Sequence, residues 1–145
     1  MTTPDAMTAE DRQLQQQATA EAAGKQSHYY FSMRPHAQVV GACASRNEIT
    51  VALKQDGAAD EGVVATVADF WTSVAISATN GGRQAVTTAL TVQTLRPLAP
   101  GATVHVVCRA AGGRAAAASA LFADPADATA PYATAVHTKA WARSN

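Results

Sequence analysis

Residues 60–82 read DEGVVATVADFWTSVAISATNGG, and this stretch decides the fold. Apolar side chains recur at intervals of three and four, which is the spacing of one helix face: Val63, Val67, Phe70, Trp71, Val74 and Ala78. Asp60 is a suitable N-cap, and Asn80-Gly81-Gly82 supplies residues that tolerate positive φ at a helix end. From Val63 to Gly82 only Asp69 is charged. A helix this apolar on most sides must be enclosed by the rest of the protein.

The segments around this helix predict an antiparallel sheet. Residues 38–55 read as two short strands turned at 45–47, and residues 85–95 alternate Val or Leu with Thr or Gln. Residues 103–110 and 114–122 flank Gly112-Gly113, a hairpin signal, and 132–141 form the last strand. A weaker helix begins at Thr8 and ends at Gly24. We expect this helix to lie on the surface of the domain.

The composition is that of one folded domain. The 145 residues are 48% hydrophobic and 15% charged, with a formal net charge of zero. That balance disfavours nucleic acid and membrane surfaces as partners, and no apolar stretch is long enough to insert into a membrane. The N-terminus lacks the features of a secretory or transit peptide, so we expect a cytoplasmic protein. Cys43 and Cys108 read as two buried thiols, with no metal site.

One helix cannot cover both faces of such a sheet. Its remaining exposed side, together with the long strand of residues 85–95, needs a partner surface. A two-fold homodimer is the usual solution, and pairs of dimers extend it to a homotetramer.

A polar flank runs along the enclosed helix. At about 100° per residue, Gly62, Thr66, Asp69 and Ser73 fall within a wedge of roughly 60°. An ionised carboxylate is rarely buried without partners, so an acid on an enclosed helix favours a functional role for Asp69. The alternatives are a solvated flank or a purely structural acceptor of hydrogen bonds. Gly62 lies in the first turn, where free amide N–H groups favour negative charge and a missing side chain admits a ligand. Such a pair suits acyl transfer to water, with the amide stabilising an oxyanion and the acid activating water.

These residues resemble a known family. Residues 60–69, DEGVVATVAD, are similar to the H-G-G-x-x-A-T-L-x-D segment of hot-dog-fold acyl-CoA thioesterases of the PaaI type. Leu95-Arg96-Pro97 resembles the L-R-P ending of that family's long strand, and Gly113-Arg114 its Gly-Arg hairpin. His137-Thr138-Lys139 resembles the last strand of the human-type members of the thioesterase superfamily. The similarity covers residues 38–141 in the right order.

The resemblance implies a hot-dog fold, an α+β architecture in which an antiparallel sheet wraps around one central helix, here with an extra N-terminal helix. It divides the single domain 1–145 into residues 1–34, the N-terminal helix and connection, and a core of residues 35–143. It implies Asp69 as general base or nucleophile, Gly62 as the amide that binds the thioester oxygen, and Thr87 as an assistant to the water. The family site forms between two subunits. No cofactor is implied, because coenzyme A arrives as part of the substrate.

The sequence also departs from the family pattern. The family's His is Asp60, its first Gly is Glu61, and its Asn falls at Lys54 or Gln55. A carboxylate beside a developing oxyanion is unfavourable, and losing an oxyanion donor costs about 10²–10³ in rate. Gln55 is the alternative donor that we consider.

Other polar residues complete the expected site. We expect substrate contacts from Gln55, Asp60, Glu61, Thr66, Ser73, Arg96, Arg114 and Lys139. Arg96, Arg109, Arg114 and Lys139 are candidates for the phosphates of coenzyme A, although solvated surface charge explains each one singly. The four histidines are scattered. A His–acid dehydratase site would use a histidine upstream of the helix, and even His36, the nearer of the two upstream histidines, lies too far from it.

Two functions follow. The first is hydrolysis of a fatty or aromatic acyl-CoA to free acid and CoA. The second is a catalytically degenerate hot-dog protein that binds an acyl or CoA ligand or serves assembly. Retention of Asp69 favours the first, and the Asp60-Glu61 pair favours the second.

Overall fold

A computed structural model describes residues 6–25, 36–54, 60–127 and 129–143. Its elements follow the chain as α1 (Ala9–Gly24), β1 (His36–Cys43), the short 3-10 helix η2 (Ala44–Arg46), β2 (Glu48–Lys54), α3 (Glu61–Ala78), β3 (Ala85–Thr94), β4 (Thr103–Ala110), β5 (Ala116–Ala123) and β6 (Ala133–Trp141). The expected order of helices and strands is therefore confirmed. Gln55, one of the expected contacts, lies outside the described residues.

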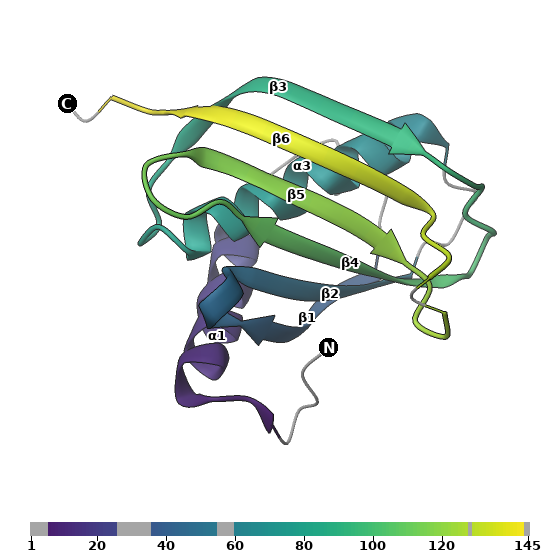
Figure 1. Ribbon diagram of the computed structural model, residues 1–145, viewed down its shortest axis with the longest axis horizontal. Coiled ribbons are helices and arrows are strands. Elements are labelled where there is room, and N and C mark those ends of the chain that lie inside the picture. Colours follow the sequence, from purple (N-terminus) through teal and green to yellow (C-terminus); the bar gives the residue numbers. More distant parts are fainter. Residues whose placement is uncertain (1–5, 26–35, 55–59, 128, 144–145) are drawn as a thin grey trace.

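The strands form one antiparallel sheet in the order β1-β2-β4-β5-β6-β3. The sheet wraps around α3, and α1 lies beside the β1 end (Figure 1). This is the predicted arrangement of an antiparallel sheet around one central helix with an extra N-terminal helix. β1 and β3 form the two ends of the sheet in this chain.

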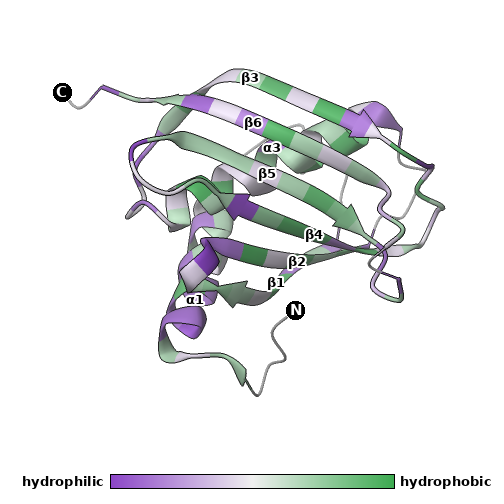
Figure 2. Cartoon of the chain, viewed as in Figure 1, coloured by the Kyte–Doolittle hydropathy of each residue, from purple (hydrophilic) through white to green (hydrophobic). Residues whose placement is uncertain are grey.

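Helix α3 supplies the centre of the core. Val64, Val67, Trp71 and Val74 are each 3% exposed or less, and they pack against inward-facing residues of the sheet such as Phe122. Figure 2 shows mainly pale and hydrophobic colours along α3 and more hydrophilic residues on α1. The helix begins as expected, because the Asp60 carboxylate accepts a hydrogen bond from the amide of Val63 at 3.0 Å. It is followed by Gly81 and Gly82, both at positive φ.

Helix α1 is fixed to the sheet by a buried acid. Thr8 and Asp11 form a capping box. The other oxygen of Asp11 accepts a hydrogen bond from the amide of Ala44 at 2.7 Å. This bond, followed by the bond from Thr8, lowers the pKa of the Asp11 carboxyl. Leu14 and Ala18 of α1 are buried in the core, so α1 packs against the sheet and α3 through this face.

Two expectations need correction. Cys108 is buried, and its burial raises the pKa of the thiol, but Cys43 is only partly buried because it ends β1 at the edge of the sheet. Helix α3 is not enclosed on every side, because the side chain of Asp69 is 54% exposed and Glu61 and Gly62 are exposed as well. In a single chain this flank meets solvent, since the described strands of the sheet cover it only in part.

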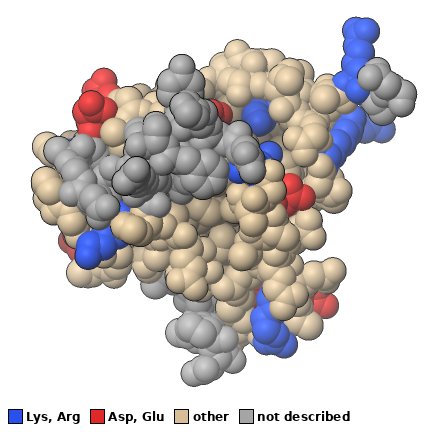
Figure 3. Space-filling model, turned by 180° about the vertical axis from the view of Figure 1, so that it is seen from behind, with Lys and Arg blue, Asp and Glu red and all other residues tan. Residues whose placement is uncertain are grey.

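Within the described ranges, no helix is both long and apolar enough to cross a membrane. The face seen in Figure 3 carries its Lys and Arg side chains at separate places rather than in one broad patch. The zero net charge is therefore also reflected in the distribution of charge on that face.

Candidate active site

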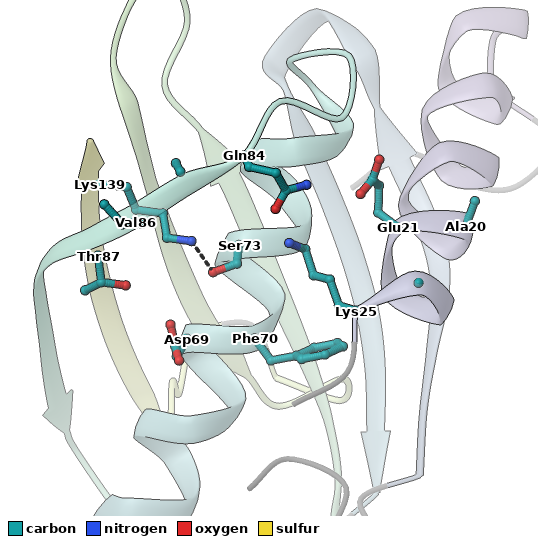
Figure 4. Close-up of a pocket in the computed structure, with 12 residues that line it drawn as sticks. Ala20, Glu21, Lys25, Asp69, Phe70, Ser73, Gln84, Val86, Thr87 and Lys139 are labelled. Carbon is teal, nitrogen blue, oxygen red and sulfur yellow. Dashed lines mark hydrogen bonds between the residues drawn. The ribbon is translucent and has the colours of Figure 1, made fainter. Parts of the chain in front are cut away.

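A cavity of about 690 Å³ opens beside the exposed flank of α3. Four expected site residues line it together: Asp69, Ser73, Thr87 and Lys139. Its other walls come from the C-terminal end of α1, from Phe70 and from residues 84–86 (Figure 4). The structure thus brings together side chains that are up to 70 positions apart in the sequence, from three different elements.

Thr87 faces this cavity because of an irregularity in the sheet. On β3 and β6, Thr87 is opposite Lys139 and Ala89 is opposite Thr138, so Thr88 is an extra residue in the register. Directly opposed residues of an antiparallel pair share a face, so Thr87 lies on the same side as Lys139. Simple alternation places Thr87 on the face opposite Leu90. The bulge at Thr88 reverses that alternation and turns Thr87 toward α3.

A buried histidine connects α3 to β3. His137 on β6 is fully buried, its Nδ1 lies 2.7 Å from Oγ1 of Thr72 and its Nε2 lies 2.8 Å from Oγ1 of Thr87. Nε2 is also 3.7 Å from a carboxylate oxygen of Asp69. Asp69 and Thr87 are therefore both positioned next to one imidazole edge.

The hydrogen bonds define the tautomer of His137. Thr72 donates its single hydroxyl hydrogen to the carbonyl of Ala68 at 2.6 Å, so toward His137 its oxygen can only accept. We therefore assign the proton to Nδ1, which donates to Thr72. Nε2 is then the acceptor, and the hydroxyl of Thr87 donates to it. The oxygen of Thr87 keeps lone pairs with which it can accept a hydrogen bond from a water molecule.

The imidazole is held in its neutral form. Burial lowers the pKa of His137 below 6.5, the positive charge of Lys139 lowers it further, and Asp69 opposes this shift. A neutral ring is required for the network above, because a protonated Nε2 could no longer accept from Thr87.

Sequence reasoning missed His137 as a site residue, although a signal was present. Ala133 and Ala135 are buried, and His137 follows them at period two on the same face of β6. A histidine that continues a buried face needs polar partners, which Thr72 and Thr87 provide. From the sequence, His36 is the histidine to consider as a partner for an acid on the helix, but the histidine beside Asp69 is His137.

The other expected residues of α3 lie at its N-terminal end. Gly62 is exposed, and its carbonyl accepts from the hydroxyl of Thr66 at 2.8 Å. Among the described residues, none is found to accept from the amide of Gly62, since the Asp60 cap takes up the amide of Val63 instead. Asp60 nevertheless stays close, because a Cβ on Gly62 would lie 3.2 Å from its carboxylate oxygen. Glu61 is exposed in the same turn.

The two arginines do not reach the cavity. Arg96 stacks on Tyr132 with 3.8 Å between its guanidinium carbon and the ring centre, and it donates to the carbonyl of Ala130 at 2.6 Å. Arg114 is exposed at the hairpin, where its carbonyl accepts from the indole of Trp141 at 2.8 Å. Arg109 pairs with Glu48 on the neighbouring strand. Among the described residues, no group of His, Cys, Asp and Glu could hold a metal ion.

Comparison with solved structures identifies the fold. The chain is similar to zebra fish thioesterase superfamily member 2, with a TM-score of 0.69 and 18% identity over 89% of this chain and 96% of that one. It is similar to the E. coli PaaI protein of the phenylacetic acid degradation operon, with a TM-score of 0.69 and 15% identity over 91% and 98% of the two chains. A Streptococcus mutans protein solved with acetyl CoA bound matches with a TM-score of 0.58 and 18% identity over 67% and 82%.

No family model and no curated protein sequence matches the chain. The architecture is the hot-dog fold of thioesterase superfamily proteins, and the resemblance drawn from residues 60–69 is confirmed at the level of the fold.

Proposed function

We propose that this protein hydrolyses an acyl-CoA thioester, with a fatty or aromatic acyl group, to the free acid and CoA. The observation that carries the proposal is the cavity in which the carboxylate of Asp69 and the hydroxyl of Thr87 lie beside one neutral imidazole. The fold is shared with thioesterase superfamily proteins, and a Streptococcus mutans protein of similar structure was solved with acetyl CoA bound.

In the proposed reaction Asp69 accepts a proton from a water molecule held by Thr87. The water oxygen forms a bond to the thioester carbon, and the carbonyl oxygen becomes an oxyanion. The amide N–H of Gly62 stabilises that oxyanion at the positive end of a helix. The carbon–sulfur bond then breaks, the proton passes to the leaving thiolate, and the acid and free thiol depart. His137 acts as a positioning residue, because it fixes the direction of the Thr87 hydroxyl.

Gly62 and Asp69 are separated by seven residues of helix, a rise of about 10 Å. The substrate carbonyl and the attacking water must fit between the amide of Gly62 and the carboxylate of Asp69. In a site between two subunits, the Gly62 amide of one copy and the Asp69 carboxylate of the other can meet at the same substrate. On that ground we propose a homodimer, or a pair of dimers. Val86 on the end strand β3 is 60% exposed in one chain, which leaves this edge available for a second copy.

Asp60 favours the alternative of a hot-dog protein that binds its ligand without turnover. Its carboxylate lies beside Gly62, where the oxyanion would develop. The two functions are separated by measuring release of free thiol from a panel of acyl-CoAs together with calorimetric binding of the same panel. Release above the uncatalysed rate supports hydrolysis. Binding without release supports the alternative.

A further inference from the structure

Two lysines converge on the cavity beside Asp69. Lys139 comes from β6 and Lys25 from the C-terminal cap of α1, and both side chains line the cavity. In Figure 4 the amine of Lys25 points toward Ser73 and Gln84, and the amine of Lys139 reaches Ser73 from the opposite wall. We call Lys25, Ser73 and Lys139 the lysine pocket.

The charges of the lysine pocket are not neutralised within the described part of the chain. Lys139 donates to the neutral hydroxyl of Ser73 at 2.8 Å, which uses one of its three N–H groups. No carboxylate of a described residue forms an ion pair with Lys139 or Lys25. Burial and the positive charge of Lys25 both lower the pKa of Lys139, so the two ammonium groups repel each other here. An anion bound between them would relieve that repulsion.

Two carboxylates also line the cavity, but neither occupies this position. Oε1 of Glu21 accepts from Gln17 at 3.1 Å and lies near Gly82, on the α1 side of the cavity. Asp69 lies toward Thr87 and His137, and it raises the pKa of Lys139 without reaching ion-pair distance. The anion that fits the lysine pocket must therefore come from a ligand.

The position of the pocket relative to Asp69 restricts what that ligand is. Ser73 is one helical turn beyond Asp69, about 6 Å along α3. A group held by Ser73 and Lys139 is therefore only a few bonds away from a carbonyl attacked next to Asp69. The phosphates of coenzyme A are separated from the thioester by the whole pantetheine arm, which is too long for this position. Phe70 and Val86 add apolar surface to the same cavity.

We propose that the lysine pocket binds a carboxylate at the far end of the acyl group, so that the substrate is the CoA thioester of a short dicarboxylic acid. This inference rests on the proposed function and deepens it. It gives Lys139 an acyl contact in place of the contact to a CoA phosphate expected from the sequence.

The test compares glutaryl-CoA with pentanoyl-CoA, which have the same number of acyl carbons but end in a carboxylate and a methyl group. We expect wild type to prefer glutaryl-CoA by about tenfold or more in kcat/KM, because a charge-assisted hydrogen bond in a half-buried site is strong. In Lys139→Met and in Lys25→Met this ratio should fall toward one, mainly through the KM of glutaryl-CoA. Arg143→Met removes the same charge from an exposed position after β6 and should leave the ratio unchanged.

A binding arm separates failure of this inference from failure of the proposed function. Calorimetry measures binding of glutarate, pentanoate and free CoA to the intact protein and to both lysine variants. Glutarate binding that needs the lysines supports the pocket even if no thioester is hydrolysed. Hydrolysis of both thioesters at equal kcat/KM, with no glutarate binding, overturns the pocket and leaves the function standing. A loss of CoA binding in Lys139→Met, with glutarate unaffected, also overturns it, because the lysine then binds a CoA phosphate.

Discussion

The hydroxyl oxygen of Thr87 lies 2.8 Å from Nε2 of His137, although the two residues are 50 positions apart in the chain. Thr72 holds the opposite nitrogen of the same ring at 2.7 Å. This chain of three side chains links the buried side of α3 to the exposed strand β3. It fixes the hydroxyl next to Asp69, and most of our predictions test one of its members.

Removing the hydroxyl of Thr87 should slow the reaction. In Thr87→Val the side chain keeps its shape but can no longer hold a water molecule, so we expect kcat for acyl-CoA hydrolysis to fall about 10–100-fold. Thr87→Ser keeps the hydroxyl and should stay within a few-fold of wild type. Equal rates for the Val and Ser variants would exclude Thr87 from the reaction.

Removing the hydroxyl of Thr72 should mainly affect stability. Thr72→Val leaves the Nδ1–H of a fully buried His137 without an acceptor, and a buried donor without a partner costs about 1–3 kcal/mol. Urea unfolding of wild type and variant measures this difference. A free energy of unfolding equal to that of wild type would show that the proton of His137 is not on Nδ1.

The lowered pKa of His137 predicts how stability depends on pH. An unfolded chain takes up a proton on this histidine near pH 6.5, whereas the folded protein resists it to lower pH. The contribution of His137 is thus complete above pH 6.5 and is lost as the pH falls from there toward the folded-state pKa. Unfolding measured between pH 5 and 8 should show a steeper decline for wild type than for His137→Gln.

Nitrogen NMR of the imidazole gives an independent measurement of the same network. At pH 7 the shifts should report a neutral ring protonated at Nδ1. A ring that is protonated at both nitrogens at that pH would contradict the assignment.

The Asp60 carboxylate should slow hydrolysis while it stabilises the helix. Asp60→Asn keeps an N-cap of similar quality but removes a negative charge next to Gly62. We expect kcat to rise about three- to tenfold, since a like charge near the oxyanion is removed. Glu10→Gln is the matched control, because it removes one charge from the first turn of α1, outside the cavity. A fall in kcat for Asp60→Asn, at unchanged thermal stability, would show that the carboxylate assists the reaction.

The fold could be predicted because its signals are local. The three-and-four spacing of residues 63–78 and the Gly112-Gly113 hairpin each require only neighbouring residues to interpret. The face on which Thr87 lies could not be predicted, since the bulge at Thr88 is set by pairing with β6 and leaves no mark in the alternation of β3. The lysine pocket could not be predicted from the sequence either, because Lys25 at the end of α1 and Lys139 on β6 come together only in the folded chain. The exposure of Asp69 could not be predicted either, because it depends on which flank of α3 the folded sheet leaves uncovered.

The central claim is that Asp69 activates the attacking water. Asp69→Asn keeps the size of the side chain and removes its basicity, and Asp127→Asn, the same change at an exposed residue outside the cavity, is the matched control. Thiol release is measured at saturating acyl-CoA, with calorimetry confirming that the variant still binds its substrate. We predict a loss of kcat of about 10²-fold or more for Asp69→Asn and a kcat close to that of wild type for Asp127→Asn. Turnover by Asp69→Asn equal to that of wild type would contradict the account.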